Sequence, residues 1–152
     1  MRRKDRERDE SFALEVLRDC EYATLATTNP DGTPYCIPIS PVLIENTIYF
    51  HCAPEGQKLE NINKNNIVCI SGVGYTKLIP EKITTEYESA VATGKCYIVT
   101  DNEENIMALK AICEKYAKSS MEHFEKKIAE YSHRTCVCKI ELMKITGKAN
   151  RM

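Results

Sequence analysis

Three short runs of β-forming residues, separated by turns of only a few residues, constrain the fold of this chain most strongly. They occupy residues 22–28, 35–44 and 47–52. The first turn contains Asn29-Pro30-Asp31-Gly32, in which proline and glycine supply the backbone angles of a tight reversal. Connections this short cannot hold a crossover helix, so the sequence predicts an antiparallel meander.

The rest of the chain adds helices and three further strands. Apolar residues at helical spacing predict helices over residues 9–20, 57–64 and 121–131, and a helix that starts at Asp101, with Glu104 completing a capping box. The helix that starts at Asp101 is expected to bury a stripe of Ile106, Leu109, Cys113 and Tyr116. A strand buried on both faces is expected at 67–73, a strand bent at Gly94 at 87–99, and a last strand at 135–145. Residues 74–85 are expected to form a loop.

These elements predict a mainly β (α+β) fold in which six antiparallel strands form a closed or partly closed barrel with peripheral helices. Closure is expected because it removes unpaired strand edges. No repeat, low-complexity tract or linker interrupts the 152 residues, so residues 1–152 are expected to form a single domain.

Composition narrows the function classes. The 21 Lys and Arg residues against 22 Asp and Glu residues leave a net charge of −1, which argues against nucleic acid as a partner. No apolar run approaches the roughly 20 residues that span a bilayer, and the charged start is not a secretory signal, so we expect a cytoplasmic protein without membrane contact. The eight cysteines lie where apolar residues are expected and no CxxC occurs, so we expect reduced thiols and no metal site.

The most informative segment joins the third strand to the short helix at 57–64. Gly56 and Lys58 lie at the start of that helix, where free backbone N–H groups and the helix dipole attract an anion. Lys58 adds a full positive charge, although a lysine at this position can also be an ordinary solvated side chain. His51 and Tyr49 are expected to share the strand face opposite Phe50, where His51 is either a structural residue or a proton donor to a ligand beside Lys58.

Two other segments can contact a ligand. Prolines at 38 and 41 remove hydrogen-bond donors, so the strand containing Pro38, Ile39 and Ser40 is expected at an edge, where unpaired backbone can bind a planar heterocycle. Ser89 can offer a hydroxyl, although an ordinary half-exposed strand face explains it equally well. His123 and His133 are expected at the surface. The absence of GxGxxG and nucleophile-elbow motifs disfavours Rossmann and hydrolytic chemistry.

Six short motifs, in this order, resemble the nitroimidazole-resistance reductases of the pyridoxamine 5′-phosphate oxidase-like FMN-binding split-barrel superfamily. They are Arg2–Glu7 (RRKDRE), residues 22–27 (YATLAT), 34–39 (PYCIPI), 48–51 (IYFH), 55–59 (EGQKL) and 87–89 (YES) with Gly94. The resemblance spans nearly the whole chain.

The resemblance implies a six-stranded split barrel that forms a homodimer and binds FMN between the subunits. Lys58 would contact the phosphate near the backbone of Gly56 and Gln57. The flavin ring would lie against the strand of Pro38, Ile39 and Ser40, with contacts from His51, Tyr49 and Ser89. The arginine-rich tail of true pyridoxamine-phosphate oxidases has no counterpart, so vitamin B6 oxidation is not expected.

The function expected from these observations is that of a reductase. It would pass electrons from reduced FMN to a small acceptor such as a nitroaromatic or a quinone, with His51 supplying a proton. A non-catalytic flavin- or haem-binding module for storage or sensing, and a scaffold without any cofactor, are the alternatives.

Overall fold

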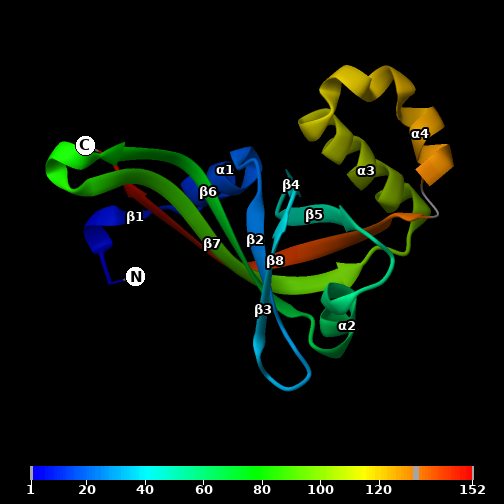
Figure 1. The fold of residues 1–152 in the computed structure, drawn as a ribbon, viewed down its shortest axis with the longest axis horizontal. Helices are drawn as coiled ribbons and strands as arrows, with labels where there is room; N and C mark the ends of the chain where they lie inside the picture. Colours follow the sequence, from blue (N-terminus) through cyan, green and yellow to red (C-terminus); the bar gives the residue numbers. More distant parts are fainter. Residues whose placement is uncertain (1, 132–133, 152) are drawn as a thin grey trace.

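The computed structural model of the protein describes residues 2–131 and 134–151, and in these residues eight strands form one antiparallel sheet (Figure 1). The strands are β1 (Glu7–Arg8), β2 (Ala23–Thr28), β3 (Pro34–Ile39), β4 (Val42–Ile44), β5 (Thr47–Cys52), β6 (Ile67–Ile79), β7 (Thr84–Ile98) and β8 (Cys136–Asn150). Their order is β3-β2-β6-β7-β8-β5-β4, and β1 pairs with β8. The mainly β, α+β split-barrel fold predicted from the sequence is confirmed.

The run predicted as one strand over 35–44 is two strands, β3 and β4, which lie at opposite edges of the sheet. Only Ser40 and Pro41 connect them, so the sheet must curl until its two edges meet at this corner. Proline lacks the N–H that would continue the ladder, which explains the break. The carbonyl of Pro41 accepts hydrogen bonds from Lys115 Nζ at 2.9 Å and from the Tyr116 hydroxyl at 2.8 Å. This split and the short β1 account for eight strands where six were expected.

The expectation of a loop over residues 74–85 is wrong. β6 continues to Ile79, and β7 begins at Thr84, so the two form a long hairpin arm, visible in green at one end of the molecule (Figure 1). A short 3-10 segment, Pro80–Lys82, and Ile83 in a left-handed conformation close it. The sequence pattern is weak here because much of the arm is exposed, including its apolar residues Leu78 at 74% and Ile83 at 95%.

The expectation that residues 67–73 are buried on both faces is also wrong. Val68, Ile70 and Gly72 are buried, whereas the alternate residues are exposed or half-buried. Gly94 does mark an irregularity, since the register of β7 against β8 shifts between Thr93 and Gly94. A Cβ at Gly94 would collide with the Glu141 backbone, so glycine permits this close approach.

α-Helices and short 3-10 segments surround the sheet. The helices are α1 (Glu10–Asp19), α2 (Gln57–Lys64), α3 (Asn102–Tyr116) and α4 (Phe124–Tyr131); the other 3-10 segments are Lys4–Arg6 and Lys118–His123. The helix predicted over 9–20 and the helix predicted over 57–64 are confirmed, and so is the capping role of Asp101, whose Oδ1 accepts from the amide of Glu104 at 2.8 Å. No helix in residues 2–131 and 134–151 is long and apolar enough to cross a bilayer.

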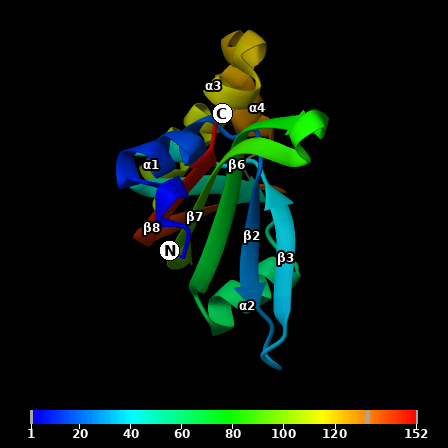
Figure 2. The same ribbon diagram turned by 90° about the vertical axis from the view of Figure 1, so that its left-hand side faces the viewer.

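Two apolar clusters lie on the two faces of the curled sheet. α1 covers β6, β7 and β8 with Ala13, Val16 and Leu17, and this cluster continues into the barrel interior (Figure 2). α3 packs against β4 and β5 with Ala108, Leu109 and Ile112. The predicted buried stripe of α3 is therefore correct at Leu109 and wrong at Ile106, which is 40% exposed. The apolar residues of α3 are spread around the helix, so the side that is buried depends on how the helix packs on the sheet.

Candidate functional site

A pocket of about 330 Å³ opens where β3, β5 and α2 meet. It is lined by Tyr22, Pro38, Ile39, Ser40, His51 and Lys58, and we call it the Lys58 pocket. Five of these six residues are among those predicted from the sequence to bind a cofactor. The curl of the sheet brings them together, since Ser40 ends one edge strand and His51 lies on β5, which pairs with the strand at the other edge.

The first turn of α2 provides an anion-binding arrangement. Gly56 precedes the helix with a φ of 124°, a conformation that side chains disfavour, and no side chain caps the helix there. The first backbone amides of α2 that donate hydrogen bonds within the helix are those of Leu59 and Glu60, and both donate to the carbonyl of Gly56. In the part of the chain that the structure describes, the amides of Gln57 and Lys58 are thus left for a ligand, as is usual for a first helical turn.

The side chain of Lys58 starts from the same helical turn, and its Nζ lies 5.4 Å from the centroid of the Phe50 ring. Phe50 is fully buried, so the aromatic ring supports the lysine stem at the edge of the core. A positive charge in the first turn of a helix is opposed by the helix dipole. The arrangement is therefore suited to a negatively charged group that both the ammonium and the free amides can contact.

A buried polar network holds α2 in place. Asn61 is 0% exposed, and its Nδ2 donates to Thr27 Oγ1 at 3.0 Å and to Asn29 Oδ1 at 2.8 Å. Gln57 Nε2 donates to Asn61 Oδ1 at 3.1 Å. These bonds tie the helix to the turn between β2 and β3, which fixes the position of Lys58 relative to Ser40.

The β3 edge supplies the other wall. In the described residues β3 pairs with β2 alone, so the edge position predicted from its prolines is confirmed. Pro38 and Ser40 are exposed on this edge, whereas Ile39 is buried. The backbone groups on the outer side of β3 are available to a flat, hydrogen-bonding ligand.

His51 is exposed at the mouth of the pocket, yet the surrounding protein withdraws enough water to lower the pKa of its imidazole, and the charge of Lys58 lowers this pKa further. His51 is consequently neutral at pH 7, with one ring nitrogen able to donate a hydrogen bond and the other able to accept one. An anion bound to Lys58 would remove part of the repulsion and make the imidazole easier to protonate.

The structure places the remaining predicted residues in three locations. Gly56 and Gln57 adjoin the Lys58 pocket, as described above. Tyr49 lies on the same face of β5 as His51 but two residues earlier, where it is buried against α3, and its hydroxyl donates to Glu104 Oε1 at 2.9 Å. Ser89 lies on the β6–β7–β8 arm and donates to the Lys148 carbonyl at 3.4 Å. Within the described residues, neither Tyr49 nor Ser89 lines the Lys58 pocket.

Tyr22 is the pocket residue that the sequence analysis did not select. It is 62% exposed immediately before β2, so its ring is available to stack on a planar ligand. An aromatic residue next to a strand is usually part of the core. The sequence feature that could have identified Tyr22 as a ligand contact was its position at the start of the motif at residues 22–27.

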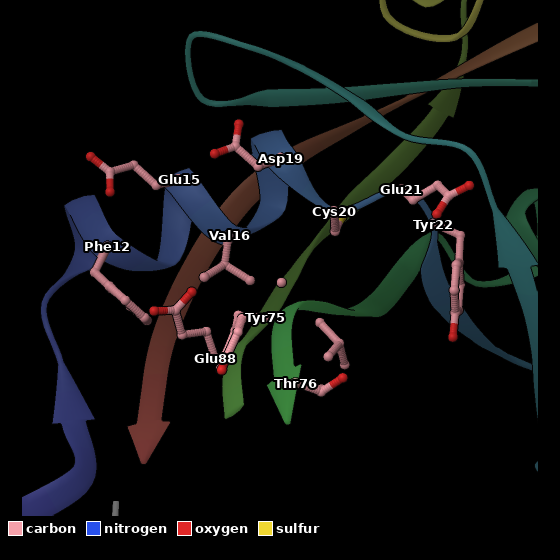
Figure 3. Close-up of a pocket in the computed structure, with 12 residues that line it drawn as sticks. Phe12, Glu15, Val16, Asp19, Cys20, Glu21, Tyr22, Tyr75, Thr76 and Glu88 are labelled. Atoms are coloured by element: carbon pink, nitrogen blue, oxygen red, sulfur yellow. The ribbon is translucent and has the colours of Figure 1, made fainter. Parts of the chain in front are cut away.

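A second and larger pocket, of about 510 Å³, lies along α1 (Figure 3). We call it the carboxylate pocket because Glu15, Asp19, Glu21 and Glu88 line it, together with aromatic residues that include Tyr75. Figure 3 shows Glu88 and Tyr75 side by side beneath α1, with Tyr22 beyond the end of the helix. Tyr22 lines both pockets.

Part of this negative charge is already paired. Arg151 donates to Glu88 Oε1 through Nε at 3.0 Å and Nη2 at 2.8 Å, and its guanidinium lies 3.4 Å from the centroid of the Tyr75 ring. The carboxylate pocket thus already contacts one organic cation from its own chain. Its electrostatic character is opposite to that of the Lys58 pocket.

All eight cysteines have free thiols: three are buried, four are half-buried, and Cys36 is exposed. Burial raises the pKa of Cys20, Cys69, Cys113 and Cys136, so these thiols stay protonated at neutral pH. His123 is exposed, as expected, and its Nε2 lies 3.1 Å from Glu122. His133 lies outside the described residues.

Comparison with known proteins places these features in a family. A family model described as pyridoxamine 5′-phosphate oxidase matches residues 9–149. A search of curated protein sequences finds no match. A candidate 5-nitroimidazole antibiotic resistance protein from Bacteroides thetaiotaomicron is 27% identical, with a TM-score of 0.74 over 94% of this chain and 88% of that one. These findings confirm the family resemblance that the sequence motifs indicated.

Two other solved structures share the fold. An FAD-binding protein from Mycobacterium smegmatis is 17% identical, with a TM-score of 0.69 over 96% of this chain and 98% of that one. An FAD- and haem-binding protein from the same organism is 14% identical, with a TM-score of 0.77 over 95% of this chain and 72% of that one.

Proposed function

Because this chain belongs to the pyridoxamine 5′-phosphate oxidase family, we propose that it is a flavoprotein whose Lys58 pocket binds FMN and whose activity is that of a reductase. The observation that carries this proposal is the first turn of α2, where the ammonium of Lys58 and two free amides adjoin an edge strand. Neighbours that bind FAD by their titles support a flavin ligand, and FAD is itself a phosphate-bearing flavin.

Each side chain has a defined task in this proposal. Lys58 and the amides of Gln57 and Lys58 hold the phosphate, and the backbone at Pro38 and Ser40 orients the ring. Tyr22 covers a ring face and excludes water. When bound, FMN supplies hydride-transfer chemistry that amino-acid side chains lack. The neutral His51 donates a hydrogen bond to the acceptor and, once the charge of Lys58 is compensated, delivers a proton to it.

The acceptor belongs to the class of small, electron-poor compounds such as nitroaromatics, including nitroimidazoles, or quinones. The similarity to the candidate nitroimidazole-resistance protein supports this class. The pocket of about 330 Å³ is small for a complete flavin. This is consistent with a homodimer in which a second copy completes the site, acting in the cytoplasm, as the sequence resemblance implies.

The phosphate assignment is tested by titrating the flavin-free protein with FMN and with riboflavin, which lacks the phosphate. A charged hydrogen bond contributes about 1.5–3 kcal/mol, so FMN should bind about 10- to 100-fold more tightly than riboflavin. Lys58→Met should reduce this difference substantially, because only the two amides would then contact the phosphate. Lys64→Met, an exposed lysine at the other end of α2, is the matched control and should preserve it. Equal affinities for the two flavins in the unaltered protein would contradict the proposal.

The reductase assignment is tested separately from flavin binding. Protein reduced without air should be reoxidised rapidly on addition of a nitroimidazole or a quinone, and His51→Gln should slow this reoxidation while retaining the flavin. A flavin-loaded protein that is indifferent to these acceptors would instead be a storage or sensor module. A haem Soret band in place of flavin absorbance would identify a haem-binding module.

A further inference from the structure

Three cysteine thiols meet at the junction of β5 and β8, on the face of β5 opposite His51. Cys52 is the last residue of β5, and the register pairs it directly with Cys136, the first residue of β8. Cys138 follows two residues later and therefore points to the same face as Cys136. The three Sγ atoms all lie within 4.8 Å of one another.

The burial of the three thiols is graded. Cys138 is fully buried, whereas Cys52 and Cys136 are half-buried at the strand ends. Cys136 makes a weak hydrogen bond, at 3.8 Å, to the carbonyl of Val137 and also interacts with the thiols of Cys52 and Cys138. An ion can therefore reach the cluster from the Cys52 and Cys136 side and contact Cys138 at the bottom, without a rearrangement of the sheet.

The geometry of the thiols matches a single small metal ion. Zinc–thiolate bonds are about 2.3 Å long, so sulfur atoms placed trigonally around one ion are separated by about 4.0 Å. From a separation of at most 4.8 Å, the side chains must approach by less than about 1 Å. Rotation about χ1 at the two half-buried positions can provide this movement.

The ligand set indicates which metal is suited. In the described residues, the group contains three sulfur donors and neither an imidazole nor a carboxylate, and soft thiolates select Cu(I) or Zn(II) over hard cations. Structural zinc almost always takes four protein ligands, whereas three thiolates saturate Cu(I) in a trigonal plane. The hydrogen bond with Cys138 and burial raise the pKa of Cys52, and burial raises the pKa of Cys136, so a bound ion must displace the thiol protons; the positive charge of Lys58 opposes these increases only in part.

We propose that Cys52, Cys136 and Cys138 form a binding site for one cuprous ion. Binding forms three Cu–S bonds and releases the three thiol protons to solvent, with no change in the oxidation state of copper or sulfur. As far as the structure describes its lining, the Lys58 pocket includes none of the three cysteines, and Cys52 and His51 point to opposite faces of β5, although Lys58 lies near both. It departs from the sequence expectation of no metal site, which rested on the absence of closely spaced ligands.

The test uses the 152-residue chain as purified, kept reduced and free of air. Cu(I) is supplied from a buffer of bathocuproine disulfonate, whose competition prevents isolated thiols from binding. We expect one Cu(I) per chain and a sulfur-to-copper charge-transfer band in the near ultraviolet. Cys52→Ser and Cys136→Ser should each weaken binding by more than about 100-fold, since loss of an outer-shell partner alone typically costs about 10- to 100-fold.

Two control variants keep the result interpretable. Cys113→Ser removes a half-buried thiol on α3, and Cys36→Ser removes the exposed thiol on β3; both should bind copper as the unaltered chain does. Retained circular dichroism shows that the Cys52 and Cys136 variants fold. Equal copper affinity in all variants would overturn the proposal, and so would retention of zinc in preference to copper or a Cys52–Cys136 disulfide that forms instead of the metal complex.

Discussion

The two pockets that share Tyr22 differ in the property that decides which ligand each can bind. The carboxylate pocket has the larger volume, about 510 Å³ against about 330 Å³. Four carboxylates line it, and it already contacts the guanidinium of Arg151. The Lys58 pocket, as far as the structure describes its lining, has a lysine and a histidine and no carboxylate.

The comparison teaches that charge and free backbone donors, rather than volume, identify the candidate flavin site. A phosphate dianion would be repelled by the carboxylates along α1. At Lys58 the charge of the ammonium and the dipole of the helix start both attract an anion to the first turn of α2. The predictions below test whether this electrostatic difference governs flavin binding.

The largest effect is expected when the Lys58 pocket is given the charge of the other pocket. Lys58→Glu should weaken FMN binding by more than about 100-fold, because it replaces attraction of the phosphate by repulsion. An acidic residue is favourable in the first turn of a helix, so this variant should fold at least as stably. Isothermal titration with FMN, with thermal unfolding in parallel, checks both statements.

The matched change in the carboxylate pocket is the control for that experiment. Glu15→Lys alters the charge by the same amount on an exposed face of α1 and should leave FMN affinity within about twofold. If this variant changed FMN affinity as strongly as Lys58→Glu, the assignment of the flavin to the Lys58 pocket would be wrong.

A smaller effect is expected where the structure positions the pocket without contacting the ligand. Asn61→Ala removes the hydrogen bonds to Thr27 and Asn29 and leaves buried acceptors unpaired, so the free energy of unfolding should fall by about 1–3 kcal/mol. FMN affinity should fall with it as α2 loosens. Urea unfolding measures the first quantity, and Asn63→Ala, an exposed asparagine on the same helix, should leave both unchanged.

Tyr49→Phe separates a structural role from the cofactor contact predicted for this residue. Loss of the hydroxyl removes the hydrogen bond to Glu104, which also pairs with Lys139 at 2.8 Å, and should cost about 0.5–1.5 kcal/mol of stability. FMN affinity should not change, because the hydroxyl faces α3. Weaker FMN binding at unchanged stability would restore Tyr49 to the flavin site.

The smallest effect concerns the titration of His51. Burial lowers the pKa of this imidazole first, and the charge of Lys58 lowers it further. Lys58→Met should therefore raise the pKa of His51 in flavin-free protein, although burial keeps it below its ordinary value. NMR titration of the imidazole resonances measures this shift, and an unchanged pKa would show that Lys58 and His51 do not interact.

Local patterns predicted α1 and α2 well, because capping residues and helical spacing act within a few residues. The edge position of β3 followed from its prolines for the same reason. The β6–β7 arm was not predicted because much of it is exposed, so no alternation of apolar residues marks residues 74–85. The buried side of α3 was misplaced because the sheet selects it, and the helix carries apolar residues on more than one side.

The starts of α1, α2 and α3 and the edge position of the strand that contains Pro38 follow from the sequence alone, and so does the expectation of an anion site at Gly56 and Lys58, since each depends on backbone and side-chain chemistry in one short segment. The tertiary structure decided which of these segments meet. Curling of the sheet joins Ser40, His51 and Lys58 around one pocket, and β5–β8 pairing brings Cys52 to Cys136 across more than eighty residues of sequence. Such meetings depend on register and curvature, which arise from packing of the whole chain.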